Sequence, residues 1–66
     1  MKYTIKDVSE ELLISKDALI DVRNMLRIKK INESNFKRIK NVVREIERRY
    51  GKCTLSTINR YQLWCD

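Results

Sequence analysis

Four basic side chains between residues 37 and 48 have the types and spacing to bind phosphate groups. Lys37, Lys40, Arg44 and Arg48 follow intervals of three and four residues, which places them on one face of a helix at about 100° per residue. Such a strip can neutralise a nucleic-acid backbone, and the counterions released make binding steeply salt-dependent. The alternative is a solvated helix face with local ion pairs, for which Glu33 is well spaced.

The net charge of the chain favours a polyanionic partner. The 66 residues include 15 Lys and Arg against 9 Asp and Glu, which gives a formal charge of +6 at pH 7. A small domain with this imbalance commonly meets nucleic acid, although a charge of this size also serves solubility alone. Nucleic acid is therefore the leading candidate partner, and the helix pattern described below narrows it to double-stranded DNA.

The residue types needed for catalysis or metal binding are scarce. The chain has no His, its cysteines are Cys53 and Cys65, and it contains no CxxC pair, phosphate-binding loop or nucleophile beside a general base. We therefore expect no enzymatic activity, no metal, no cofactor and no small-molecule substrate. No apolar run resembles a signal peptide or approaches the roughly 20 residues of a membrane span, so we expect a cytoplasmic protein with reduced thiols.

The composition predicts an all-α fold. Pro is absent and Gly occurs once, while the commonest residues are good helix formers. A chain of 66 residues is near the lower limit for a core formed without metal or disulfides. We expect one domain, residues 1–66, folded as a small three- to four-helix bundle that contains a helix-turn-helix. The expected helices cover about residues 5–13, 16–27, 34–50 and 55–64.

The first two of these helices have the apolar spacing of a helix-turn-helix. The apolar residues on either side of a short break at residues 14–16 are Val8, Leu12, Leu19, Val22 and Leu26. Positions four apart stack on one face, so the spacing predicts two short helices packed across a tight turn. Such a unit places the exposed face of its second helix where it can enter the major groove of DNA. A purely structural helical pair is the alternative.

A resemblance supports this interpretation of the first half. Residues 8–22, VSEELLISKDALIDV, resemble the helix-turn-helix of prokaryotic DNA-binding proteins, and residues 3–8, YTIKDV, are similar to the opening of MerR-type regulators and phage excisionases. Leu13 stands where this family commonly has Gly, because the backbone of the turn adopts positive φ. Since a γ-branched residue in the left-handed region costs roughly 1 kcal/mol, we expect a longer or differently bent turn.

The second half predicts a long helix, which Asn32 or Ser34 can cap and Gly51 can end. Its apolar stripe consists of Phe36, Ile39, Val43, Ile46 and Tyr50. We favour packing of this stripe against the N-terminal helices over a coiled-coil seam, which normally needs three or four heptads.

The last helix is expected to be capped by Thr54 or Ser56 and to turn Leu55 and Ile58 inward. The run from Ser56 to Trp64 is similar to a segment in the DNA-binding domains of KfrA-type plasmid proteins. That resemblance implies nucleic-acid contact in this helix as well.

Two sets of residues are candidates for DNA contact. If the second helix docks in the major groove, it presents Ser15, Lys16, Asp17, Ile20, Asn24 and Arg27. In that position Asn24 can pair with adenine and Ile20 can meet a thymine methyl group, while Asp21 brings a negative charge towards the duplex. The second set belongs to the basic surface of residues 29–52 and to the last helix, and consists of Lys37, Lys40, Arg44, Arg48, Thr57, Asn59 and Arg60.

The sequence thus predicts a small, sequence-specific DNA-binding protein of phage, plasmid or bacterial type. It would act as a transcriptional regulator, an excisionase-like recombination accessory or a partition factor. A unit of this kind usually gains affinity by pairing on a two-fold site, which admits a homodimer. The alternative function is an adaptor or inhibitor that docks its basic helix on an acidic protein.

Overall fold

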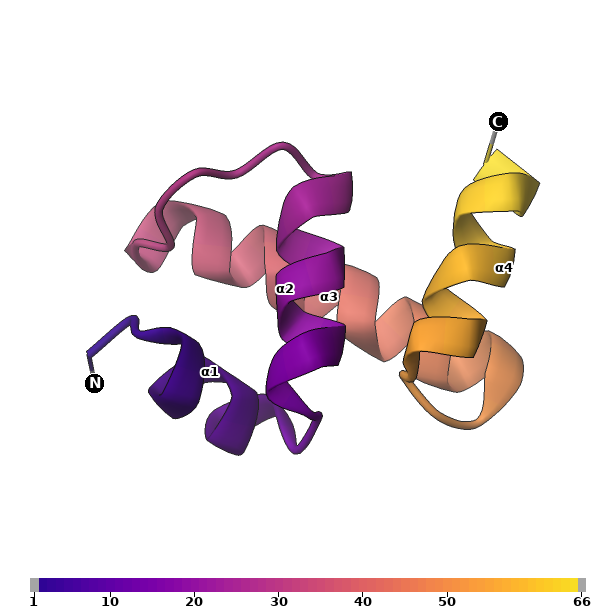
Figure 1. The fold of residues 1–66 in the computed structure, drawn as a ribbon, viewed down its shortest axis with the longest axis horizontal. Helices are drawn as coiled ribbons and strands as arrows, with labels where there is room; N and C mark the ends of the chain where they lie inside the picture. Colours follow the sequence, from indigo (N-terminus) through magenta and orange to yellow (C-terminus); the bar gives the residue numbers. More distant parts are fainter. Residues whose placement is uncertain (1, 66) are drawn as a thin grey trace.

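Four helices make up the fold (Figure 1). The computed structural model describes residues 2–65, and the side chains of residues 2–63; the side chains of Trp64 and Cys65, which enter two of the sequence interpretations, lie outside this range. The helices are α1 (Ile5–Leu12), α2 (Lys16–Met25), α3 (Glu33–Tyr50) and α4 (Leu55–Cys65). The predicted all-α class is confirmed. Over residues 2–65, no helix combines the length and apolar character that a membrane crossing requires.

A polar side chain caps the start of each of the first three helices, because the first amides of a helix have no intrahelical acceptor. Thr4, Ser15 and Asn32 each accept a hydrogen bond from the amide three residues later, at 3.1, 3.1 and 3.0 Å. At α3 the Asn32 amide also donates to the Asn35 side chain at 2.6 Å, which completes a capping box. Asn32, and not Ser34, is therefore the cap of the long helix.

Leu13 occupies the left-handed region in the turn between α1 and α2. Its φ and ψ are 59° and 42°, its amide donates to the Glu10 carbonyl at 3.2 Å, and the Ile14 amide donates to the Ser9 carbonyl at 3.0 Å. These two bonds form a Schellman motif, an ending that usually has Gly at this position. The expectation of a longer or differently bent turn is wrong, since Leu13 takes the strained conformation itself. By contrast, Gly51 supplies the φ of 85° that ends α3.

α2 also ends in a Schellman motif, and it ends two residues before the end that the sequence predicts. Arg27 has a φ of 58°, its amide donates to the Asn24 carbonyl, and the Ile28 amide donates to the Arg23 carbonyl, both at 3.0 Å. This second Schellman motif turns the chain out of the helix, so α2 ends at Met25. Because Arg27 is itself the left-handed residue that ends the helix, it lies on the loop that leads to α3.

α2 lies at the centre of the bundle and contacts the other three helices. In Figure 1 α3 lies behind α2, while α1 and α4 flank α2 on opposite sides. The buried apolar side chains are Val8, Leu12, Ala18, Leu19, Val22, Ile31, Ile39, Val43, Ile46, Cys53 and Ile58. The central part of the α3 stripe is thus buried within one chain, in agreement with the intramolecular packing that we favour over a coiled coil.

Two apolar positions differ from the prediction. Leu55 is 50% exposed because it is the first residue of α4, and the face that turns towards the core begins at Ile58. Leu26 is only partly buried, since it follows the last residue of α2.

Near the N-terminus, the rings of Tyr3 and Phe36 lie 5.6 Å apart between centroids. This contact packs the N-terminal segment against the start of α3.

Candidate nucleic-acid interface

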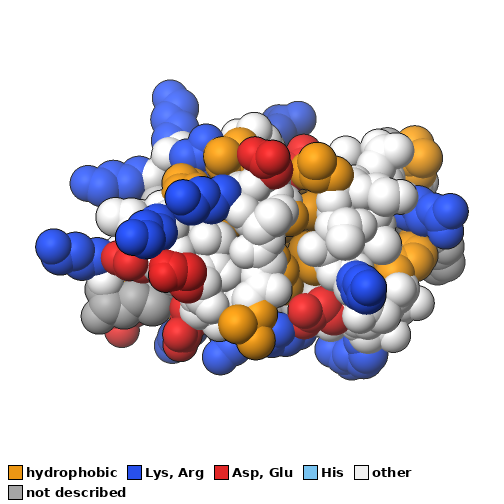
Figure 2. All heavy atoms as spheres, turned by 60° about the horizontal axis from the view of Figure 1, so that its bottom comes forward, with side chains coloured by type: hydrophobic (Ala, Val, Ile, Leu, Met, Phe, Trp, Pro, Cys, Tyr) orange, Lys and Arg blue, Asp and Glu red, His pale blue; other side chains and the backbone are white. Residues whose placement is uncertain are grey.

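The positive charge of the protein is segregated along the chain. Residues 5–25, which span α1 and α2, carry three basic and five acidic side chains, whereas residues 26–52, which span the α2–α3 loop and α3, carry ten basic and three acidic ones. Figure 2 shows Lys and Arg side chains gathered towards the two ends of the molecule, with acidic side chains among them and across the middle. The segment that forms α1 and α2 is therefore net negative, and the loop and α3 carry the excess of positive charge.

The outer side of α3 carries the predicted basic strip. Lys37, Lys40, Arg44 and Arg48 are all exposed and lie away from the buried stripe of the same helix. Arg44 donates to Glu47 at 2.7 Å, an exposed pair of the kind that contributes little to stability and can exchange partners. The other three make no ion pair with any residue in the described part of the chain. An external anion would therefore meet cations without an internal partner.

The α2–α3 loop adds three exposed cations next to the start of this strip. They are Arg27, Lys29 and Lys30. Ile31, which is 5% exposed, anchors the loop in the core, and the Asn35 side chain donates to the Lys30 carbonyl at 2.8 Å. These contacts fix the loop backbone against the first turn of α3. The loop thus presents its charges from a defined position.

The face of α2 that the sequence predicts to read bases is narrow. Lys16, Asp17 and Asn24 are exposed, but Ile20 and Asp21 are only partly so. Helices α1 and α4 flank α2, so its accessible surface is a single strip. That strip is nearly neutral because Asp17 lies beside Lys16.

The outward strips of α2 and α3 lie on different sides of the molecule. α2 packs against the buried stripe of α3, so the exposed strips of the two helices face outward from opposite sides of the core. The major groove of B-DNA is about 12 Å wide and admits one helix. One straight duplex can therefore meet the strip on α2 or the strip on α3, and the fold does not combine them.

α4 contributes Asn59 and Arg60, both exposed, while Thr57 has a structural role. The Thr57 hydroxyl accepts from the Thr54 amide at 2.7 Å and donates to the Lys52 carbonyl at 2.8 Å. The Thr54 hydroxyl accepts in return from the Thr57 amide at 3.3 Å. These two threonines form the capping box of α4, so Thr54 is its cap and the polar atoms of Thr57 are engaged within the protein.

A polar cluster fastens α4 to α3. The Tyr61 hydroxyl donates to Glu45 Oε2 at 2.8 Å, and Arg49 pairs with Glu45 Oε1 at 3.3 Å. The Arg49 guanidinium lies 5.7 Å from the centroid of the Tyr61 ring, within the range of a cation–π contact. This cluster gives Arg49 a structural role, distinct from that of the cations on the basic strip.

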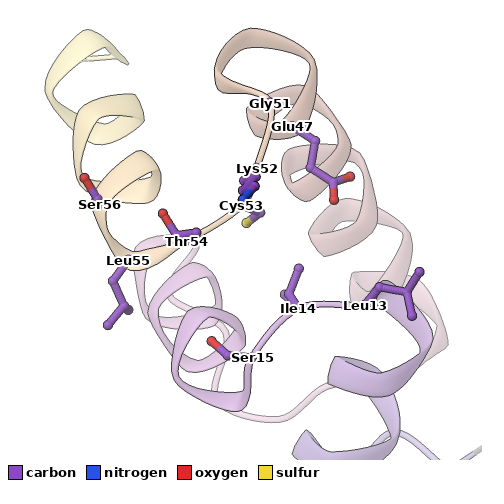
Figure 3. Close-up of a pocket in the computed structure, with 10 residues that line it drawn as sticks. All are labelled: Leu13, Ile14, Ser15, Glu47, Gly51, Lys52, Cys53, Thr54, Leu55 and Ser56. Atoms are coloured by element: carbon purple, nitrogen blue, oxygen red, sulfur yellow. The ribbon is translucent and has the colours of Figure 1, made fainter.

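A pocket of about 580 Å³ lies between the α1–α2 turn and the α3–α4 connection (Figure 3). Cys53 lines it with its sulfur directed towards the turn at Ile14. Burial raises the pKa of Cys53 from 9.0 to about 11, with smaller contributions from the charges of Glu47 and Asp21. The thiol therefore stays protonated near neutral pH and is a poor nucleophile. Asp21 is only partly exposed, and its charge acts on the Cys53 thiol.

No family model, curated protein or solved structure matches the chain.

Two exposed residues of α3 belong to the same side as the basic strip but are absent from the predicted set. Arg38 and Asn41 are both exposed. At about 100° per residue, Arg38 lies about 60° to one side of Asn41 and Arg44 about 60° to the other. A helical projection of the sequence would have placed both residues on this side. The predicted set misses them because it follows only basic residues at intervals of three and four from Lys37.

Proposed function

We propose that the protein binds double-stranded DNA, without catalysing a reaction, through a basic face formed by α3 and the α2–α3 loop. The basic face consists of Arg27, Lys29, Lys30, Lys37, Arg38, Lys40 and Arg48, which are exposed and have no ion pair among the described residues. The observation that carries the proposal is the segregation of charge: residues 26–52 hold ten basic and three acidic side chains, while residues 5–25 are net negative.

The arrangement of these cations supports a nucleic-acid partner over a role in solubility alone. Charges that serve solubility need no fixed order, whereas these lie along one helix and on one anchored loop. With 18 residues, α3 is about 27 Å long, and duplex DNA carries a negative charge about every 1.7 Å of its axis. A rigid cationic rod of this length is therefore matched to several phosphates of one duplex.

The proposal has consequences for location and assembly. In a bacterial cell, or one that carries a phage or plasmid, the DNA lies in the cytoplasm, so we place the protein there and expect Cys53 to remain reduced. A face with seven cations gives strongly salt-dependent affinity. A second copy on an adjacent half-site would raise the affinity further.

The test compares two variants that lose the same charge from different sides of the molecule. In the first, Lys37→Gln, Lys40→Gln and Arg48→Gln remove three cations from the basic face. In the matched control, Lys2→Gln, Lys6→Gln and Lys16→Gln remove three exposed cations from the N-terminal segment, α1 and α2. Both variants fall from a formal charge of +6 to +3, and every substituted side chain is exposed, so both are expected to fold.

The expected result is a difference in the salt dependence of binding to a random-sequence duplex. Each phosphate contact contributes about 0.9 to the slope of log K against log salt, so the basic-face variant should lose about 3 from that slope. The control should keep the wild-type slope. The reverse outcome would assign the contact to the α1–α2 side. Absence of wild-type binding at low salt would contradict the proposal and favour the adaptor that docks on an acidic protein.

A further inference from the structure

The exposed amide of Asn41 stands at the centre of the outer side of α3. Asn41 is the ninth residue of an 18-residue helix, far from both ends, where Asn is a poor helix former and has no cap to supply. Its side chain makes no hydrogen bond with any described residue, in contrast to Asn32 and Asn35, which form the capping box. No contact within residues 2–63 gives this amide a structural role.

Cationic side chains flank Asn41 on both sides of the helix. Arg38 and Arg44, three residues before and after it, lie about 60° to either side around the axis. Lys37 and Arg48 lie one and two turns away along the same side. This pattern suits a helix that enters a major groove. The residue in the middle of the exposed face contacts the bases, and the residues on either side contact the phosphates of the two strands.

α3 is also the helix with the accessible surface that groove entry demands. It forms one side of the bundle, since α2 and α4 contact it from the core side, and nine of its 18 residues are exposed. The alternative reader, α2, is flanked by α1 and α4 and carries Asp17 on its outward strip. A helix needs a free arc along its length to fit a groove about 12 Å wide, and α3 provides it.

We infer that α3 is the helix that enters the major groove and that Asn41 reads an adenine there, by accepting from its N6 amino group and donating to its N7. This inference rests on the proposed DNA binding and specifies which side chain supplies its sequence preference. The helix-turn-helix formed by α1 and α2 then acts as the support that holds α3, and is not itself the reader.

The experiment selects bound duplexes from a random-sequence pool at physiological salt, with wild-type protein, Asn41→Ala and Asn24→Ala. Wild-type protein should recover a motif with a preferred adenine, and direct titration should give a preference of about 5-fold to 100-fold over another base at that position. Asn41→Ala should lose this preference while it binds random duplex within about 3-fold of wild type, because its phosphate contacts remain. Asn24→Ala, the matched control on α2, should keep the preference.

Stability provides a second readout. Because Ala is a better helix former than Asn, Asn41→Ala should melt at a higher temperature than wild type, so a lost preference cannot come from unfolding. Loss of the preference in Asn24→Ala alone would overturn the inference in favour of α2. Binding of random duplex without any selected motif would overturn the inference and leave the proposed function standing, whereas no binding at low salt would overturn both.

Discussion

The turn between α1 and α2 leads to a prediction whose sign depends on the backbone at Leu13. A left-handed conformation costs an L residue roughly 1–2 kcal/mol relative to Gly, and Leu13 has φ 59° and ψ 42°. Its side chain is 83% exposed, so only about a sixth of it is buried. Since full burial of Leu contributes about 1.5–3 kcal/mol, truncation should cost only about 0.3–0.5 kcal/mol. Both Leu13→Gly and Leu13→Ala lose this contact, but only Gly relieves the strain.

Part of that relief is offset, because Gly has more backbone entropy in the unfolded chain. We therefore expect Leu13→Gly to be more stable than Leu13→Ala by about 1 kcal/mol, or about 4–8 °C in Tm for a domain of this size. The assay is thermal and urea unfolding followed by circular dichroism.

A matched pair at Glu10, an exposed position inside α1, controls for the general effect of Gly. There the order should reverse, with Glu10→Ala more stable than Glu10→Gly by about 1 kcal/mol. If Leu13→Ala equals or exceeds Leu13→Gly in stability, the backbone at this turn is not left-handed and the account of the turn fails.

Three further predictions concern α4 and the thiol beside it. Ile58→Ala, at a side chain with 0% exposure, should lower the free energy of unfolding by about 2–5 kcal/mol; a loss below 1 kcal/mol would mean that α4 does not pack on the core. Tyr61→Phe removes the 2.8 Å hydrogen bond to Glu45 and should lower the free energy of unfolding by about 0.5–1.5 kcal/mol. In a Glu45→Ala background, which lacks the acceptor, Tyr61→Phe should have little effect, and an equal loss there would contradict the bond. Because the pKa of Cys53 is raised from 9.0 to about 11, its contribution to stability is fully present below pH 9 and is lost as the pH rises towards 11. Urea unfolding of wild type and Cys53→Ala across that range should show a steeper decline for wild type, and parallel curves would contradict the burial of the thiol.

Much of the fold follows from local signals in the sequence. The caps at Asn32 and Thr54 were each one of two predicted candidates, because a side-chain oxygen three residues before a free amide is a short-range arrangement. The apolar stripe of α3 and the stop at Gly51 are likewise readable from spacing and residue type. These elements agree between sequence and structure since each depends on neighbours within one helical turn.

The features that sequence reasoning missed depend on contacts between helices. The packing of α1 against α2 holds Leu13 in a conformation that its own preference disfavours. The approach of the α3–α4 connection places Asp21 near Cys53. For the candidate interface, spacing predicted the strip on α3 but not that it faces away from the strip on α2. That separation is a property of the assembled bundle.

The central claim, that the basic face binds duplex DNA, is tested most directly by titrating wild-type protein against a labelled random-sequence duplex over a range of salt concentrations. The seven cations of the basic face that make no ion pair within residues 2–63 correspond to a slope of log K against log salt of about −6. Between about 50 and 200 mM salt the affinity should fall about 4,000-fold. A slope near zero, or no binding at the lowest salt, would contradict the account.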